Sequence, residues 1–191
     1  MQLSEAKKLW PEFETFSDPA LEKLLMQCAE FWQEMRSAPL GNAYLLSLIG
    51  TSGTGKTFLG EKLYQSARVN VELLKHKWLV NPVRKGRWMD ILDQVLERDH
   101  AVIDELAAAN FLLLDEISFP KNRDGNVSDW AVERLTQLIS RRMGKWTVLT
   151  ANVAANEIEK VDKRIVSRMI RDGNRLVKVE TIDYWLRPGA K

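Results

Sequence analysis

Cysteine, excess charge of one sign and long apolar runs are all scarce in this sequence. One cysteine, Cys28, among 191 residues excludes a disulfide framework and is typical of a reducing compartment. The net charge of +2 is too small for the whole surface to attract nucleic acid, so any such surface must be local. No apolar run approaches the roughly 20 residues that span a bilayer, and the N-terminus lacks the pattern of an export signal. We therefore expect a cytoplasmic protein with no membrane partner and one substantial core.

Residues 50–57 carry the spacing of a phosphate-binding P-loop, G-x-x-x-x-G-K-T. The loop consists of Gly50, Thr51, Ser52, Gly53, Thr54, Gly55, Lys56 and Thr57. An apolar run at 44–49 precedes it and a helical pattern at 58–67 follows, which is the strand–loop–helix order that the motif requires. Glycines allow successive N–H groups to turn towards a phosphate at the start of a helix. We expect Lys56 to reach the β- and γ-phosphates of a nucleoside triphosphate and Thr57 to ligate Mg²⁺.

Apolar runs and helical patterns alternate along the rest of the chain. Strands are expected at 77–80, 111–116, 146–150 and 175–179, in addition to 44–49. Helices are expected at 86–98, 101–109, 130–142 and 164–170, with a polar loop over 119–129. This alternation predicts an α/β protein with a parallel sheet that helices cover on both faces.

The residues before the first strand form a separate region, 1–42, ahead of a nucleotide-binding domain at 43–191. Asp18 and Pro19 predict a helix start, and an apolar face follows. A shorter segment before it carries Trp10 and Phe13. This N-terminal helical extension either packs on the nucleotide domain or serves as an arm that docks a partner.

Polar groups follow the apolar runs at the points where ligand-handling residues gather in parallel sheets. Asp115 and Glu116 end the run at 111–116, and Asn152 follows the run at 146–150. Asp115 is expected to hold Mg²⁺ and Glu116 to act as general base for an attacking water. Asn152 is suited to orient that water or to contact the γ-phosphate.

Two arginines lie four residues apart in the helix expected at 164–170. Arg164 and Arg168 therefore share a helix face. A guanidinium delivered to the γ-phosphate accelerates hydrolysis by on the order of 10³–10⁵. The alternative is a solvated basic helix.

Taken together, these segments resemble the AAA+ ATPases, and within them the DnaA/DnaC/IstB branch. Gly50–Thr57, Leu112–Glu116, Thr147–Asn152 and Arg164–Met169 stand in the order of Walker A, Walker B, sensor 1 and box VII. The resemblance implies a P-loop NTPase fold of three α/β/α layers with a five-stranded parallel sheet. It also implies a homo-oligomer in which Arg164 or Arg168 of one subunit completes the ATP site of its neighbour. Arg187, in a run that resembles the Tyr-Arg pair of DnaC-like chains, is a candidate sensor 2.

Only a short tail follows Val179, so we expect no C-terminal lid domain, which argues against an initiator or a clamp loader. The first hypothesis is an ATP-dependent DNA replication helicase loader that binds single-stranded DNA and a replicative helicase. An IstB-like transposition helper is the alternative on the same core. A P-loop small-molecule kinase would not need a water-activating Glu116, and the absence of an Asn-Lys-x-Asp motif argues against a GTPase.

Two basic stretches are candidates for DNA contact. The first combines Arg84, Lys85 and Arg87 with Trp88, a pattern compatible with backbone contact and base stacking. The second runs from Lys160 to Lys191 and holds nine cations against four acids. The alternative is that these cations serve ATP and solvation.

Overall fold

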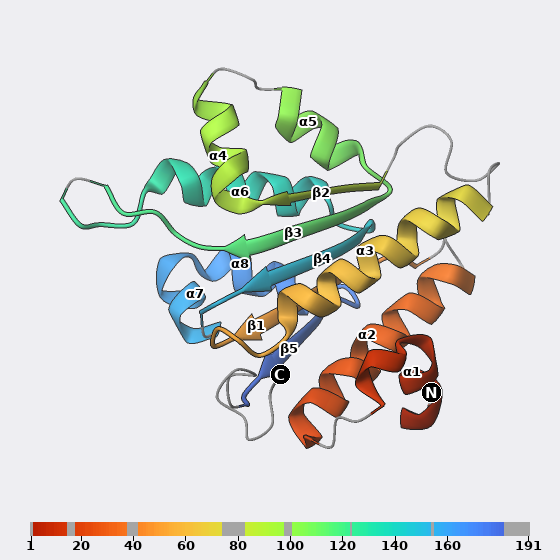
Figure 1. Ribbon diagram of the computed structural model, residues 1–191. Coiled ribbons are helices and arrows are strands. Elements are labelled where there is room, and N and C mark those ends of the chain that lie inside the picture. Colours follow the sequence, from red (N-terminus) through yellow and green to blue (C-terminus); the bar gives the residue numbers. More distant parts are fainter. Residues whose placement is uncertain are drawn as a thin grey trace.

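Five parallel strands form one sheet in the order β2-β3-β4-β1-β5 (Figure 1). The strands are β1 (Leu45–Gly50), β2 (Val83–Arg87), β3 (Phe111–Ile117), β4 (Trp146–Ala151) and β5 (Arg175–Val179). The structure, a computed structural model, describes residues 2–14, 18–37, 42–73, 83–97, 101–122, 124–153 and 155–181. The expected α/β fold with a five-stranded parallel sheet is confirmed, and among the described residues no helix follows β5.

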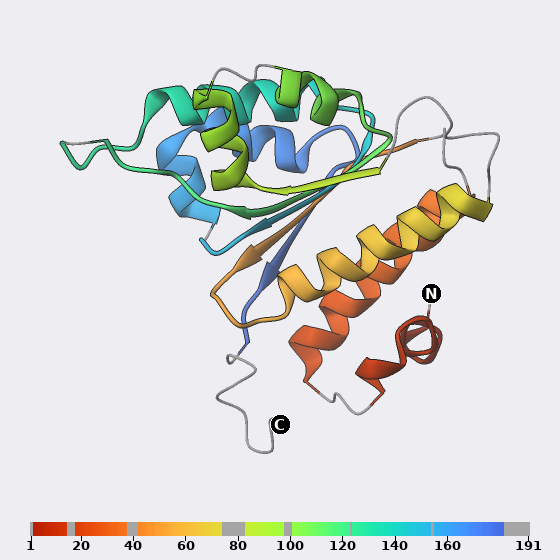
Figure 2. The ribbon, with the colours of Figure 1, turned by 45° about the horizontal axis from the view of Figure 1, so that its top comes forward.

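Helices cover both faces of the sheet and make three layers (Figure 2). One face carries α1 (Leu3–Leu9), η1 (Pro11–Phe13), α2 (Pro19–Ser37) and α3 (Lys56–Leu73). The other carries α4 (Trp88–Leu96), α5 (Ala101–Ala108), α6 (Asp129–Arg141), α7 (Ala155–Val161) and α8 (Lys163–Ile170). In β1, Leu46 and Leu48 enter the first core cluster while Leu45 and Ile49 enter the second. A strand buried on both faces is largely apolar, which explains why Ser47 is the one polar residue between Leu45 and Ile49.

The N-terminal helices share a core with the sheet. Phe31 of α2 is fully buried, and its ring makes edge-to-face contacts with Tyr44 at 5.1 Å and Trp146 at 5.2 Å between centroids. Cys28, also on this face, is buried, and burial raises the pKa of its thiol. The segment before β1 therefore packs on the nucleotide domain. That its outer face docks a partner stays a prediction.

The expected element boundaries depart from the structure mainly around β2. The strand expected at 77–80 lies outside the described residues, and the helix expected from Gly86 begins only at Trp88. Gly86 and Arg87 belong instead to β2, which has a single apolar residue and lies at the edge of the sheet. None of its residues is fully buried, so β2 gives no apolar run in the sequence. The short helix α7 was not expected at all.

No helix in the described ranges is both long enough and apolar enough to cross a bilayer.

The burial of Phe31 predicts that α2 contributes to global stability. We expect Phe31→Ala to lower the free energy of unfolding by about 3–5 kcal/mol, because it leaves a cavity between α2 and the sheet. Gln33→Ala, at an exposed position two residues on, should change it by less than about 0.5 kcal/mol. Urea denaturation of both variants measures the difference, and equal values would mean that α2 folds apart from the core.

Candidate functional site

The P-loop connects β1 to α3 through backbone conformations that favour glycine. Gly50, Gly53 and Gly55 have φ values of 149°, 72° and 85°. At Gly50 a Cβ atom would lie 2.2 Å from the carbonyl oxygen of Val179, so the close approach of β5 also excludes a side chain there. The glycine spacing seen in the sequence thus corresponds to a loop that other residues would strain.

Lys56 begins α3 with its ammonium turned back into the loop. Its side chain is buried, and Nζ donates hydrogen bonds to the Thr51 carbonyl oxygen at 2.5 Å and to Thr54 Oγ1 at 3.0 Å. Burial lowers the pKa of Lys56 to about 8, although the charge of Asp115 opposes the shift. A buried cation whose hydrogen-bond acceptors are neutral oxygens is suited to gain an anionic partner such as a phosphate.

Asp115 joins three of the expected site segments. Its Oδ1 accepts hydrogen bonds from Thr57 Oγ1 at 3.0 Å and from Thr150 Oγ1 at 2.5 Å. The Glu116 backbone N–H in turn donates to Thr150 Oγ1 at 2.9 Å. The P-loop, the acid pair and the end of β4 therefore meet at one edge of the sheet. A hydroxyl and a carboxylate in contact form a donor set that fits Mg²⁺, which prefers hard oxygen ligands and retains several waters.

Glu116 has a left-handed backbone conformation, and its carboxylate is already hydrogen-bonded to Arg87. Its φ is +52°, and the β3–β4 pairing is irregular between Leu114 and Ile117. Left-handed conformations of non-glycine residues cost about 1–3 kcal/mol and cluster at functional sites. The Glu116 carboxylate accepts hydrogen bonds from Nε, at 2.9 Å, and NH2 of Arg87 at the end of β2. Both bonds go to Oε2, so any turn of the candidate base away from Arg87 breaks them.

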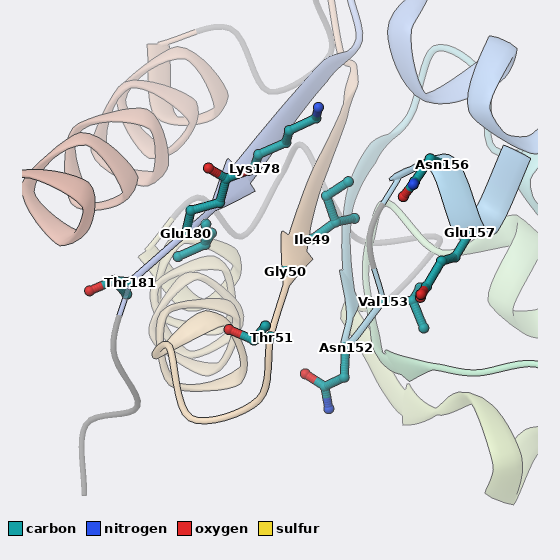
Figure 3. A pocket seen from close by; sticks show the side chains of 11 residues that line it. Ile49, Gly50, Thr51, Asn152, Val153, Asn156, Glu157, Lys178, Glu180 and Thr181 are labelled. Carbon is teal, nitrogen blue, oxygen red and sulfur yellow. The ribbon is translucent and has the colours of Figure 1, made fainter. Parts of the chain in front are cut away.

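Asn152 lies beside the P-loop at the mouth of a cavity of about 990 Å³ (Figure 3). The β1–β4 register pairs Ile49 with Ala151, which makes Gly50 and Asn152 neighbours just beyond the paired residues. The other wall comes from the end of β5, with Lys178 and Thr181. The cavity therefore lies at the ends of β1, β4 and β5, and of the expected site residues its lining includes Gly50, Thr51 and Asn152 but not Lys56, Asp115 or Glu116.

Arg164 lies on the surface and Arg168 is half-buried, and neither takes part in this cluster of contacts. Arg164 pairs with Asp162 at 2.7 Å, and its side chain is 66% exposed. Arg168 donates to the Arg164 carbonyl oxygen at 3.1 Å. Within the described residues neither hydrogen-bonds to the P-loop or to the acid pair, and Arg187 lies outside them.

The cations of the first basic stretch form ion pairs with nearby carboxylates. Arg84 pairs with Glu105 at 3.7 Å and Lys85 with Glu61 at 3.0 Å, while Arg87 holds Glu116. Trp88, the first residue of α4, is fully buried in the second core cluster, so the expectation that it stacks on bases is wrong in this structure. In the second stretch, Arg175 pairs with Glu34 of α2 at 2.7 Å.

Sequence patterns did not predict the site contacts of Thr150 or the Arg87–Glu116 pair. Thr150 is an inward-facing residue of β4, and nothing in its local pattern separates it from other strand threonines. Arg87 was noted only as a cation for DNA. Its contact with Glu116 spans 29 residues, so it could be found only once the order of the strands was known.

Comparison with known proteins identifies a family and several proteins that the chain resembles. The model of the family "ATPase family associated with various cellular activities (AAA)" matches residues 46–174. An uncharacterised protein of Bacillus subtilis (strain 168), YqaM, is 24% identical over 169 residues, which is 85% of this chain and 51% of that protein. The chain thus spans about half the length of this curated relative.

Among solved structures, the DnaC helicase loader matches with a TM-score of 0.64 and 19% identity. That match covers 91% of this chain and 99% of the loader chain. A replication initiator DnaA bound to AMPPCP and single-stranded DNA matches with a TM-score of 0.58 and 18% identity, over 82% of this chain and 46% of that one. At these identities the matches show a shared fold.

The Arg87–Glu116 ion pair predicts that Arg87→Ala raises basal ATP hydrolysis. Arg87 and Glu116 side chains are 63% and 37% exposed, and such pairs contribute about 1 kcal/mol or less. The increase should therefore not exceed about fivefold. A phosphate-release assay measures it, and Arg87→Ala combined with Glu116→Gln should be inactive. Activity in the double variant would mean that Glu116 is not the base through which Arg87 acts.

Proposed function

We propose that this chain, which belongs to the AAA family of ATPases, is an ATP-dependent loader of a replicative helicase. The observation that carries this proposal is the reciprocal fold match with the DnaC helicase loader, which spans nearly all of both chains. The match with the DnaA initiator covers less than half of the initiator. The extent of this shared fold is what supports a loader over an initiator.

The site supports ATP hydrolysis as the chemical step. Lys56 would hold the β- and γ-phosphates, while Thr57 and Asp115 would hold Mg²⁺, which neutralises charge on the phosphates. Glu116, released from Arg87, would accept a proton from the attacking water. Asn152 would orient that water or contact the γ-phosphate.

Assembly of subunits would bring an arginine to the γ-phosphate. The exposed Arg164 or the half-buried Arg168 of one subunit would approach the ATP site of the next, so that hydrolysis depends on a homo-oligomer. ATP would then hold subunits together around single-stranded DNA, and hydrolysis would release them.

The outer face of the N-terminal helices is the proposed helicase-docking surface. A hollow of about 220 Å³ lies there between α1 and α2, lined by Leu9 and Trp32 with Glu5, Gln33 and Arg36 around them. Tryptophan and arginine, which Trp32 and Arg36 supply here, are enriched at the centres of protein interfaces. Because α2 is part of the core, point variants such as Trp32→Ala are the appropriate test, whereas deletion of the segment would unfold the domain.

Mixing two inactive variants tests the proposed assembly. Lys56→Ala should not bind ATP, and Arg164→Ala or Arg168→Ala should bind ATP but hydrolyse it poorly. A mixture with Lys56→Ala should regain activity, because intact sites form between the arginine of one variant and the P-loop of the other. ATPase rates against protein concentration, with single-stranded DNA present, give the measurement.

Two outcomes would contradict the proposed function. The wild-type protein could hydrolyse ATP at full rate when dilute, with neither arginine substitution having an effect. That result would contradict the proposal that two subunits share each ATP site. Transfer of the γ-phosphate to a small-molecule acceptor would favour a kinase instead.

A further inference from the structure

Strand β3 departs from regular pairing with β4 at the point where the acid pair lies. Its register shifts between Leu114 and Ile117, which leaves Asp115 and Glu116 together opposite Thr150. Two residues opposite one form a β-bulge, and bulges next to active sites turn a side chain in a direction that a regular strand does not give it. The direction of the candidate base therefore depends on what holds this bulge.

The Glu116 backbone within the bulge is held by a side chain of β4. Its φ of +52° is a left-handed conformation, which a non-glycine residue keeps only where its surroundings stabilise it. The Glu116 N–H donates a hydrogen bond to Thr150 Oγ1 at 2.9 Å. The Thr150 hydroxyl thus stabilises the backbone conformation from which the Glu116 side chain leaves the strand.

The hydrogen bonds of this hydroxyl have a defined direction. Thr150 has one hydroxyl proton, which it donates to Asp115 Oδ1 at 2.5 Å, so its lone pairs are free to accept the Glu116 N–H. A carboxylate at the end of such a chain strengthens the bond that precedes it. The candidate metal ligand Asp115 and the backbone of the candidate base are therefore connected through one side chain.

Packing restricts the Thr150 side chain. Thr150 is 1% exposed, and its Cγ2 methyl faces Gly60 of α3, where a Cβ atom would lie 3.4 Å from that methyl. A β-branched side chain has few χ1 rotamers, and this contact restricts them further. The carboxylate of Glu116 is held instead by Arg87, whose side chain is 63% exposed. When that exposed ion pair opens, the buried hydroxyl still holds the backbone of the base.

We propose that Thr150 is a positioning residue for ATP hydrolysis, whose hydroxyl holds the Glu116 backbone so that the carboxylate can reach the attacking water. The inference rests on the proposed function, in which Glu116 takes a proton from that water. Thr150 acts without touching the nucleotide, so its loss changes the rate of the chemical step and not nucleotide binding. A displacement of about 1 Å at a reacting group can lower a rate on the order of 10²-fold.

Removal of the hydroxyl with retention of shape tests the assignment. Thr150→Val should lower kcat on the order of ten- to a hundredfold at saturating ATP and Mg²⁺, with less than about threefold change in affinity for a non-hydrolysable ATP analogue. Thr150→Ser, which keeps the hydroxyl, should retain most of the wild-type kcat. A phosphate-release assay on the full chain at high protein concentration gives kcat.

Thr147→Val is the matched control, because it makes the same substitution near the start of the same strand. Thr147 is also buried, and its hydroxyl accepts a hydrogen bond from Arg142 Nε and donates one to the Lys145 carbonyl oxygen. Its loss should lower the stability to urea and leave kcat unchanged. A loss of stability is thereby separated from a loss of positioning.

Combination with Glu116→Gln shows whether Thr150 acts through the base. If it does, Thr150→Val should cost little further activity in the Glu116→Gln background, measured as single-turnover hydrolysis, because the two residues then contribute as a unit. Losses that multiply, with a raised requirement for Mg²⁺, would overturn the assignment and mean that the hydroxyl acts through Asp115 and the metal.

Two further results would contradict the positioning role while the ATPase itself stands. In the first, the wild type hydrolyses ATP and Thr150→Val keeps its kcat. In the second, Thr150→Ser is folded by circular dichroism but loses as much activity as Thr150→Val, so that the hydroxyl does not carry the effect. If the wild type does not hydrolyse ATP in any state of assembly, the proposed function fails, and the positioning role fails with it.

Discussion

The hydrogen bonds that Asp115 accepts from Thr57 and Thr150 are the contacts on which the rest of the site depends. They connect the P-loop helix to the ends of β3 and β4, three segments far apart in the sequence. A parallel sheet with the order β3-β4-β1 brings these carboxyl ends to one edge. The same junction reaches Glu116, whose backbone N–H is bonded to Thr150. The candidate metal ligand Asp115, the candidate base Glu116 and the P-loop are thereby held in one connected arrangement.

The N-terminal helices contact this arrangement from the other side. Asp18, at the start of α2, accepts a hydrogen bond from Thr181 beyond β5 at 2.5 Å. Leu21 lies next to Gly55 of the P-loop, and Phe13 packs on Phe58 with 5.5 Å between ring centroids. The N-terminal helices that carry the proposed helicase-docking face therefore also pack against the P-loop and against α3.

Much of this could be predicted from local sequence patterns. The P-loop spacing and the apolar runs indicated the central strands, and the bounds expected for the last strand, Arg175–Val179, agree with β5. Edge strand β2 gave no apolar run, because only Val83 of its residues is apolar. Long-range polar contacts such as Arg87–Glu116 and Thr150–Asp115 depend on strand order, which no local pattern contains. The hydrogen bonds of Asn122, in the loop before α6, and the burial of Trp88 do not depend on strand order, because the former join residues two and four apart and the latter follows the helical spacing of Ile91, Leu92 and Val95.

A crystal structure with Mg²⁺ and a non-hydrolysable ATP analogue tests the central claim most directly. The account predicts that Thr57 Oγ1 and Asp115 lie on the metal, either directly or through its waters, and that Lys56 Nζ leaves the Thr51 carbonyl for the phosphates. A nucleotide bound elsewhere, or a Lys56 still turned into the loop beside it, would contradict the account.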